Sequence, residues 1–130
     1  MPDHCGNPST SSTTWNDRGG PPGPGANAGS WASGFNQVAG HQNVVAKMSG
    51  VTSGLAKGGW SADDLRPYVD YALDAFGPER LMYGSDWPLA ELGGGAPAWT
   101  AALESLLGGQ TASDRERIFG STAAAVYSLD

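Results

Sequence analysis

The sequence predicts an α/β fold that forms one part of a larger domain. Two short apolar stretches, residues 43–50 and 81–83, alternate with helical patterns, and this alternation indicates βα units around a parallel sheet. A parallel sheet is buried on both faces and needs more than two strands. The 130 residues are enough for one hydrophobic core at most. We therefore expect several βα units that belong to a larger α/β fold.

The first third of the chain predicts little regular structure. Residues 1–8 are polar and typical of turns, and residues 9–30 are rich in Ser, Gly and Pro. Such a stretch cannot bury enough apolar area to offset the entropy of ordering it, so we expect 9–30 to be a disordered loop. In residues 31–39, the apolar Trp31, Phe35 and Val38 recur at helical spacing, which predicts a short helix.

The middle of the chain predicts a strand, a helix and a second strand. Residues 43–50 are rich in β-branched side chains and end in Ser-Gly. Residues 61–76 carry one apolar stripe, and Ser61 with Asp64 forms the pattern of a capping box. Gly77-Pro78 ends this helix, and Leu81–Tyr83 is the next strand.

The last third of the chain predicts helices only. Residues 97–107 place apolar side chains, including Trp99 and Leu103, on one helical face. Residues 113–116 (Ser-Asp-Arg-Glu) resemble another capping box. A final helix is expected to restart at Gly120.

Composition and charge exclude several classes of function. The net charge is −6 with only 7 basic residues, and they form no stripe, so we expect no nucleic-acid partner. No apolar run approaches the ~20 residues of a membrane span, so no membrane association is expected. Cys5 is the only cysteine, which fits a reducing compartment, and no signal-peptide pattern is present. These observations favour a cytoplasmic location.

Three segments place polar residues beside Gly, each after a real or implied strand. They are residues 3–8, 47–50 and 84–88. In a closed parallel barrel the carboxyl ends of strands meet on one face. There His4, Asp86 and either Lys47 or Ser49 can converge, although they lie far apart in the sequence.

The residue types leave two chemical routes open. His4 and Asp86 can bind a divalent metal through imidazole and carboxylate. Alternatively, Asp86 can accept the proton of an attacking water while His4 polarises a carbonyl. Both routes hydrolyse an ester, a lactone or an amide, and neither uses Ser85 or Cys5 as a nucleophile. The structural alternatives are a turn role for Asp86, a surface position for His4 and a solvent-reaching Lys47.

Several segments together resemble the amidohydrolase superfamily, in its amidohydrolase-2 branch, and most of all the L-fuconolactonase-like sugar-lactone hydrolases. The matching segments are Asp3–Pro8, Asn43–Gly50, Leu65–Val69, Phe76–Pro88 and Ile118–Ala123. The segment Phe76–Pro88 is the longest and the most specific of them.

The resemblance implies the C-terminal part of a (β/α)₈ TIM barrel, comprising its last two to three βα units. Lys47–Gly50 would end the seventh strand, Asp86 would close the eighth, and His4 would follow the sixth. The resemblance further implies that His4 and Asp86 are the catalytic residues and also the ligands of Zn²⁺ or Mn²⁺, if a metal is used at all. Ser49 and Trp87 would contact the substrate, a sugar lactone or a similar small molecule.

The chain also departs from the family pattern. A complete barrel has about 250 residues, and the His-x-His pair expected after the first strand is absent, because His4 and His41 are the only histidines. We therefore interpret the chain as a partial barrel domain over 1–130: a truncated product, a gene with a mis-set start codon, or half of a split enzyme.

Three readings of the function follow from this incompleteness. The chain is a lactonase-like hydrolase that is inactive alone, or the C-terminal half of an enzyme that pairs with a separate N-terminal chain, or a non-catalytic α/β interaction module. A decarboxylase of the same branch is the alternative chemistry.

Overall fold

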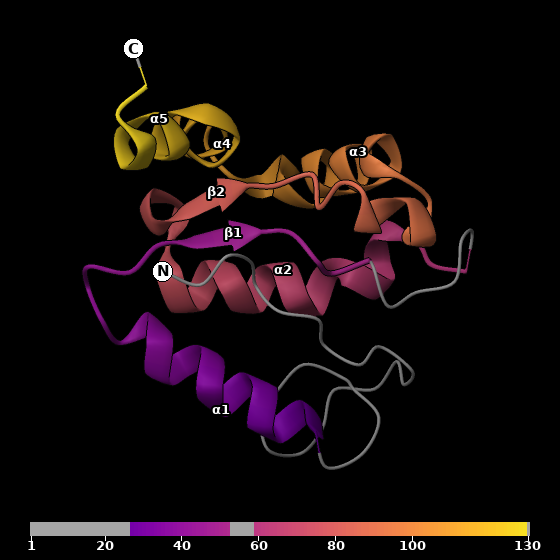
Figure 1. Cartoon of the computed structure of the whole chain (residues 1–130), viewed down its shortest axis with the longest axis horizontal. Helices are drawn as coiled ribbons and strands as arrows, with labels where there is room; N and C mark the ends of the chain where they lie inside the picture. The colour runs from indigo at the N-terminus through magenta and orange to yellow at the C-terminus, as the bar shows by residue number, and fades with distance from the viewer. Residues whose placement is uncertain (1–26, 53–58, 130) are drawn as a thin grey trace.

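A computed structural model of the chain describes residues 27–52 and 59–129, so residues 9–26 of the predicted loop 9–30 and the segment around His4 lie outside the described residues. The main elements occur in the predicted order (Figure 1): α1 (Asn27–Ala39), β1 (Ala46–Met48), α2 (Ala62–Phe76), β2 (Leu81–Tyr83), α3 (Ala96–Leu106), α4 (Ala112–Glu116) and α5 (Thr122–Tyr127). Short helical turns link them: the 3₁₀ turns η1 (Pro78–Arg80), η2 (Leu89–Gly93) and η3 (Leu107–Gly109), and the π turn η4 (Arg117–Ser121). The α/β class is thereby confirmed.

The sheet of the described residues consists of β1 and β2, which run parallel and side by side (Figure 1). Ala46 pairs with Leu81 and Met48 pairs with Tyr83. The pairing continues one step further, because the Gly84 N–H donates to the Met48 carbonyl at 3.2 Å. The two strands therefore stay in register up to the point where their polar loops begin.

The two faces of this sheet differ in what they bury. We call the face that carries Ala46, Met48 and Leu81 the outer face, because these side chains join the hydrophobic core formed with the helices. Side chains alternate along a strand, so Lys47 and Met82 lie on the opposite, inner face. The core of this chain therefore lies between the outer face of the sheet and its helices.

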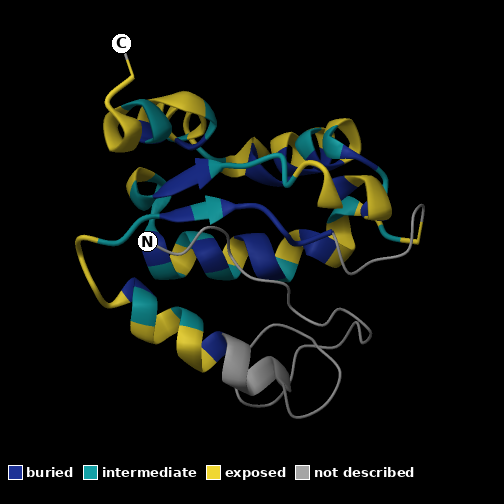
Figure 2. Cartoon of the chain, in the orientation of Figure 1, coloured by how far each residue is buried: buried dark blue, intermediate teal, exposed yellow. Residues whose placement is uncertain are grey.

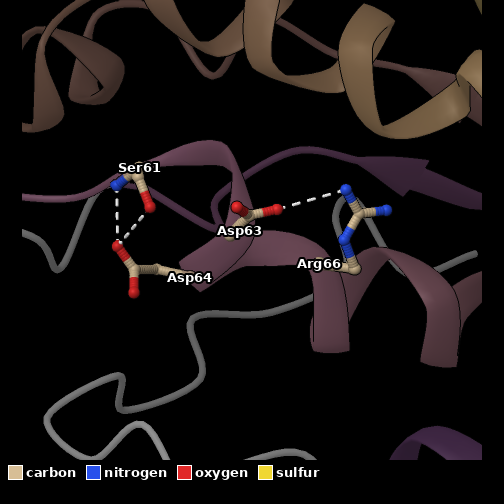
Figure 3. A network of polar contacts seen from close by, with 4 residues as sticks. All are labelled: Ser61, Asp63, Asp64 and Arg66. Carbon is tan, nitrogen blue, oxygen red and sulfur yellow. Dashed lines mark hydrogen bonds and ion pairs between the residues drawn. The ribbon is translucent and has the colours of Figure 1, made fainter.

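Helix α2 supplies one side of that core and begins as predicted. The Asp64 carboxylate accepts hydrogen bonds from the Ser61 N–H at 2.7 Å and from the Ser61 hydroxyl at 2.8 Å (Figure 3). These bonds, the backbone one first, lower the pKa of Asp64 below its ordinary value of 3.8. The predicted stripe is buried against the sheet, through Leu65, Tyr68, Val69, Ala72 and Phe76. The helix ends at Gly77, which has a φ of 72° that favours glycine.

Helix α3 packs beside α2, and its buried side faces the core (Figure 2). Trp99 is 1% exposed, and Leu103 is fully buried. This confirms the apolar face predicted for residues 97–107, which the structure places at Ala96–Leu106. Burying an aromatic or Leu side chain contributes about 1.5–3 kcal/mol, so α3 is a main source of stability.

Three sequence predictions about helix ends differ from the structure. Helix α1 begins at Asn27 rather than at Trp31, so 27–30 are helical and not part of a loop. The cap of α4 is Thr111, whose side chain accepts from the Asp114 N–H at 3.1 Å, whereas the predicted cap was Ser113. Gly120 starts no new helix, because the π turn η4 joins α4 to α5 without a break. Thr111 prevails because its hydroxyl also donates to the Asp114 carboxylate at 2.7 Å.

The amino end of β2 is fixed by Arg80. Its half-buried guanidinium lies over the Phe76 ring, 5.1 Å from the centroid. It donates hydrogen bonds to backbone carbonyls of the end of α2 and of the segment that leads into β1: Phe76 (3.0 Å), Ala75 (3.3 Å), Ala39 (2.9 Å), His41 (3.1 Å) and Val44 (3.4 Å). One side chain, placed directly before β2, thus joins α1, α2 and the segment that leads into β1.

Candidate functional site

The carboxyl ends of β1 and β2 bring the two predicted polar segments together. A side chain at Gly84 would meet the Ser49 Cβ at 3.0 Å and the Lys47 Cβ at 3.7 Å. Lys47, Ser49 and Gly84 therefore share the inner face of the sheet, and Gly84 leaves the space in which Ser49 lies. Ser49 is only 4% exposed. The structure thus places Ser49 next to the chain segment that leads to Asp86.

Asp86 lies in the loop that follows β2, as the sequence predicted. Its backbone has a φ of 59°, in the left-handed region that non-glycine residues seldom adopt. Its carbonyl accepts the Ala90 N–H at 2.8 Å, which ties the loop to η2. Its carboxylate atom Oδ2 is buried and has no hydrogen-bond partner among the described residues. A buried, unpaired carboxylate oxygen costs stability, which makes Asp86 a candidate functional residue.

Two tryptophans hold the loops around Asp86. The Trp99 indole N–H donates to the Gly84 carbonyl at 3.0 Å, from the core side of the sheet. The Trp60 indole N–H donates to the Gly93 carbonyl at 2.6 Å. Gly93 also approaches the Thr52 backbone so closely that a Cβ there would collide with the Thr52 carbonyl oxygen. The loop after β1 and the loop after β2 are therefore packed on each other.

The outer rim of the loop after β2 exposes apolar side chains. Trp87 is 72% exposed, Leu89 56% and Leu92 64%. Trp87 directly follows Asp86 in the sequence, and most of its side chain is open to solvent. The structure leaves it without a packing role in the core.

The described residues contain part of the predicted site. His4 lies outside them, so its predicted convergence with Asp86 stays a prediction. His41 is exposed in the turn after α1. No group of three His, Cys, Asp or Glu side chains that can hold a metal ion occurs within 27–52 and 59–129. Of the two predicted metal ligands, the structure thus describes Asp86 alone.

Two contributors to the site were missed at the sequence level. Trp99 was assigned to packing, which its burial confirms, but its N–H also fixes Gly84. Gly84 was predicted only as part of the polar segment 84–88, whereas its missing side chain makes room for Ser49. No sequence pattern identifies either contact, because both join residues from different elements.

Within the part of the chain that the structure describes, no helix has both the length and the apolar character needed to cross a membrane.

Comparisons with known proteins agree with this geometry. The amidohydrolase family matches residues 2–129. An L-fucono-1,5-lactonase of Burkholderia multivorans is 38% identical over 104 residues, which are 76% of this chain and 35% of that protein. An L-fucono-1,5-lactonase of Burkholderia ambifaria is 37% identical over 106 residues, which are 77% of this chain and 36% of that protein.

A solved structure matches over nearly the whole chain. It is an amidohydrolase from Burkholderia multivorans with bound zinc, at 32% sequence identity and a TM-score of 0.78, covering 98% of this chain and 43% of that one. The chain thus spans about a third of the length of the curated relatives. Its βα units correspond to the C-terminal part of an amidohydrolase TIM barrel, which confirms the predicted fold. The family match, the relatives and the fold together establish that this chain belongs to the amidohydrolase family and is similar to its L-fuconolactonase-like members.

Proposed function

We propose that this chain supplies the general base of a sugar-lactone hydrolase, and that the base is Asp86. One observation supports the proposal above the others: a carboxylate oxygen that is buried and unpaired at the carboxyl end of a parallel strand. Active sites of TIM barrels lie at this end of the strands. The lactonase names of the relatives favour a lactone as the substrate.

The proposed reaction is hydrolysis by direct attack of water. Asp86 takes a proton from the water as its oxygen bonds to the lactone carbonyl carbon. The ring C–O bond then breaks, and the proton passes to the departing ring oxygen, which becomes a hydroxyl group. The product is the open-chain sugar acid, and no covalent enzyme intermediate is formed.

Ser49 and Trp87 would contact the substrate. Ser49 is buried on the inner face beside Gly84, where its hydroxyl can hydrogen-bond a sugar oxygen. The exposed Trp87 ring offers an apolar surface for the C–H face of a sugar. His4 is included among the proposed site residues only because of the family resemblance.

The chain's residues partly fit a divalent metal such as Zn²⁺ or Mn²⁺. The unpaired Oδ2 of Asp86 has the chemistry of a metal ligand, and His4 is the second donor that the family resemblance suggests. A metal bound there would polarise the carbonyl and make the attacking water more acidic. The described residues offer no further cluster of ligands, so other ligands would have to come from the rest of a barrel.

We further propose that turnover needs the remaining part of the barrel, supplied by a separate chain. The relatives are about three times as long as the region that they share with this chain. We therefore expect the isolated chain to show no lactonase activity with added Zn²⁺ or Mn²⁺. A complementing N-terminal segment, co-expressed or fused, should restore it.

The test joins this chain to the N-terminal segment of the Burkholderia multivorans lactonase and follows acid release from L-fucono-1,5-lactone. Asp86→Asn keeps the shape of the side chain and should lower kcat by about 10²–10⁴-fold, the usual contribution of a general base. Glu104→Gln is the matched control, because it neutralises an exposed carboxylate on α3. Equal activity of the two variants, or a complemented protein that hydrolyses no sugar lactone, would overturn the proposal. Turnover by the isolated chain would overturn its requirement for a partner.

A further inference from the structure

We infer that Lys47 is a further catalytic residue, whose ammonium group binds the carbonyl oxygen of the lactone as negative charge develops there; this inference rests on the proposed function. Lys47 is the middle residue of β1, between the buried Ala46 and Met48. The register pairs it with Met82, so both side chains lie on the inner face, away from the helices. Lys47 therefore lies on the side of the sheet opposite the helices.

Lys47 also lies close to the route that leads to Asp86. A Cβ at Gly84 would come within 3.7 Å of the Lys47 Cβ and still closer to Ser49, so Lys47 borders the end of β2 with Ser49 beside it. Asp86 follows Gly84 by two positions. The flexible four-carbon stem of a lysine lets its ammonium group extend beyond the strand to the carboxyl edge.

Neither charge is neutralised by the other or by a described neighbour. Lys47 is half-buried and forms no ion pair with a described carboxylate, since Arg66 and Asp63 make the pair found there. The Asp86 Oδ2 atom is likewise unpaired. Leaving two opposite charges partly desolvated on one edge of the sheet costs free energy. Such an arrangement is typical of groups that find their partner in a ligand.

Lactone hydrolysis is accelerated by a cation or a hydrogen-bond donor placed at the carbonyl oxygen. When water attacks, the carbonyl oxygen takes up negative charge, and the product ends with a carboxylate. Asp86 can accept the proton but cannot stabilise that charge. An ammonium group on the neighbouring strand can donate hydrogen bonds to the developing oxyanion and then to the product carboxylate.

The test uses the complemented protein described above, with three variants and L-fucono-1,5-lactone as substrate. Lys47→Met keeps the length of the stem and removes the charge, so kcat should fall by about 10²–10³-fold while KM changes little. Lys47→Arg should retain a measurable part of the activity. Arg115→Met removes a cation from an exposed position of α4 and should leave kcat unchanged. Inhibition by L-fuconate should weaken at least about tenfold in Lys47→Met, the loss of one charge-assisted bond.

The outcomes separate this inference from the proposed function. If Asp86→Asn abolishes turnover but Lys47→Met behaves like Arg115→Met, the inference on Lys47 is overturned and the proposed function stands. If the complemented wild type hydrolyses no sugar lactone, both fail. Should Lys47→Met not assemble with the partner, the amide NMR shifts of Gly84 and Asp86 are followed in the isolated chain as L-fuconate is added. They should move in the wild type and stay fixed in Lys47→Gln, and equal shifts would contradict the inference.

Discussion

The two ends of β2 treat their polar groups in opposite ways. At the amino end, the Arg80 guanidinium donates hydrogen bonds to carbonyls of α1, α2 and the segment before β1. At the carboxyl end, a buried oxygen of Asp86 has no described partner, and its backbone adopts a left-handed conformation. Only the three residues of β2 separate the end whose polar groups are hydrogen-bonded from the end with an unpaired polar atom.

This difference shows that the amino end of β2 adds to the free energy of unfolding, whereas the carboxyl end lowers it. Hydrogen bonds to a charged donor each contribute about 1.5–3 kcal/mol, whereas an unpaired buried acceptor costs about 1–3 kcal/mol. In TIM barrels generally, residues at the amino ends of the strands serve stability, and residues at the carboxyl ends serve catalysis. The present chain shows it within a single βα unit.

The largest effect on stability is expected from substituting Arg80, which holds the amino end of β2. Arg80→Met keeps the contact with Phe76 but removes every donor, so the free energy of unfolding should fall by about 3 kcal/mol. Urea denaturation followed by circular dichroism measures it. Arg66→Met is the control, because Arg66 makes only an exposed ion pair with Asp63 at 3.2 Å (Figure 3) and should cost less than about 0.5 kcal/mol. Equal losses in both variants would show that Arg80 is an ordinary surface cation.

A smaller effect on stability is expected from substituting Trp99, the core residue that binds the segment between β2 and Asp86. Trp99→Phe removes the N–H that binds the Gly84 carbonyl and leaves a small cavity, so unfolding should become easier by about 2 kcal/mol. The thermal melting temperature reports the change. Trp87→Phe, at the exposed position, should leave it unchanged within about 0.5 kcal/mol. A destabilisation by Trp87→Phe as large as that by Trp99→Phe would contradict this assignment.

Removing the Asp86 side chain at the carboxyl end of β2 should make the folded chain more stable. Asp86→Gly relieves both the left-handed backbone and the unpaired oxygen, so the chain should gain about 1 kcal/mol. Ser128→Gly is the control, because Ser128 has a φ of 53° but is exposed at the end of α5, so it isolates the backbone contribution. The gain from Asp86→Gly should exceed that from Ser128→Gly, and an equal or smaller gain would show that the carboxylate carries no cost.

The smallest effect is a pH dependence at the start of α2, away from both ends of β2. The pKa of Asp64 in the folded state lies below 3.8, mainly because of the Ser61 N–H. Its stabilising contribution is therefore present above pH 3.8 and is lost as the pH falls through the lower, folded-state value. The melting temperatures of the wild type and Asp64→Asn should differ at neutral pH and converge in acid. Ser61→Ala removes one of the two donors and should keep part of the difference; a difference that grows in acid would reverse the expected sign.

Sequence reasoning predicted those parts of the fold that depend on local patterns. The alternation of strands and helices, the stripe of α2 and the Ser61–Asp64 cap were all confirmed, because periodicity and capping depend on neighbours along the chain. Helix ends were less predictable. Thr111 and Ser113 both suit a cap, and the choice depends on bonds to Asp114 that the pattern does not reveal.

The candidate site was predictable only in outline. The position of Asp86 after β2 followed from the Gly-Ser-Asp-Trp-Pro segment, and so did the family. The space that Gly84 leaves for Ser49, the Trp99 contact and the Arg80 network were not predictable, because each joins residues from separate elements. Contacts of that kind depend on the register of β1 against β2 and on how the helices pack beside the sheet, which appear only in the folded chain.

The pairing of β1 with β2 alone has a practical consequence for anyone who handles this chain. In the described sheet each strand has one hydrogen-bonded neighbour, but Ala46, Met48, Leu81 and Met82 are at most 1% exposed, so the other side of each strand opens to solvent only when the fold loosens. Unprotected rows of this kind act as templates for strand addition and aggregation. We therefore expect the purified chain to aggregate under conditions that loosen the fold, and a suitable complementing segment to suppress that aggregation.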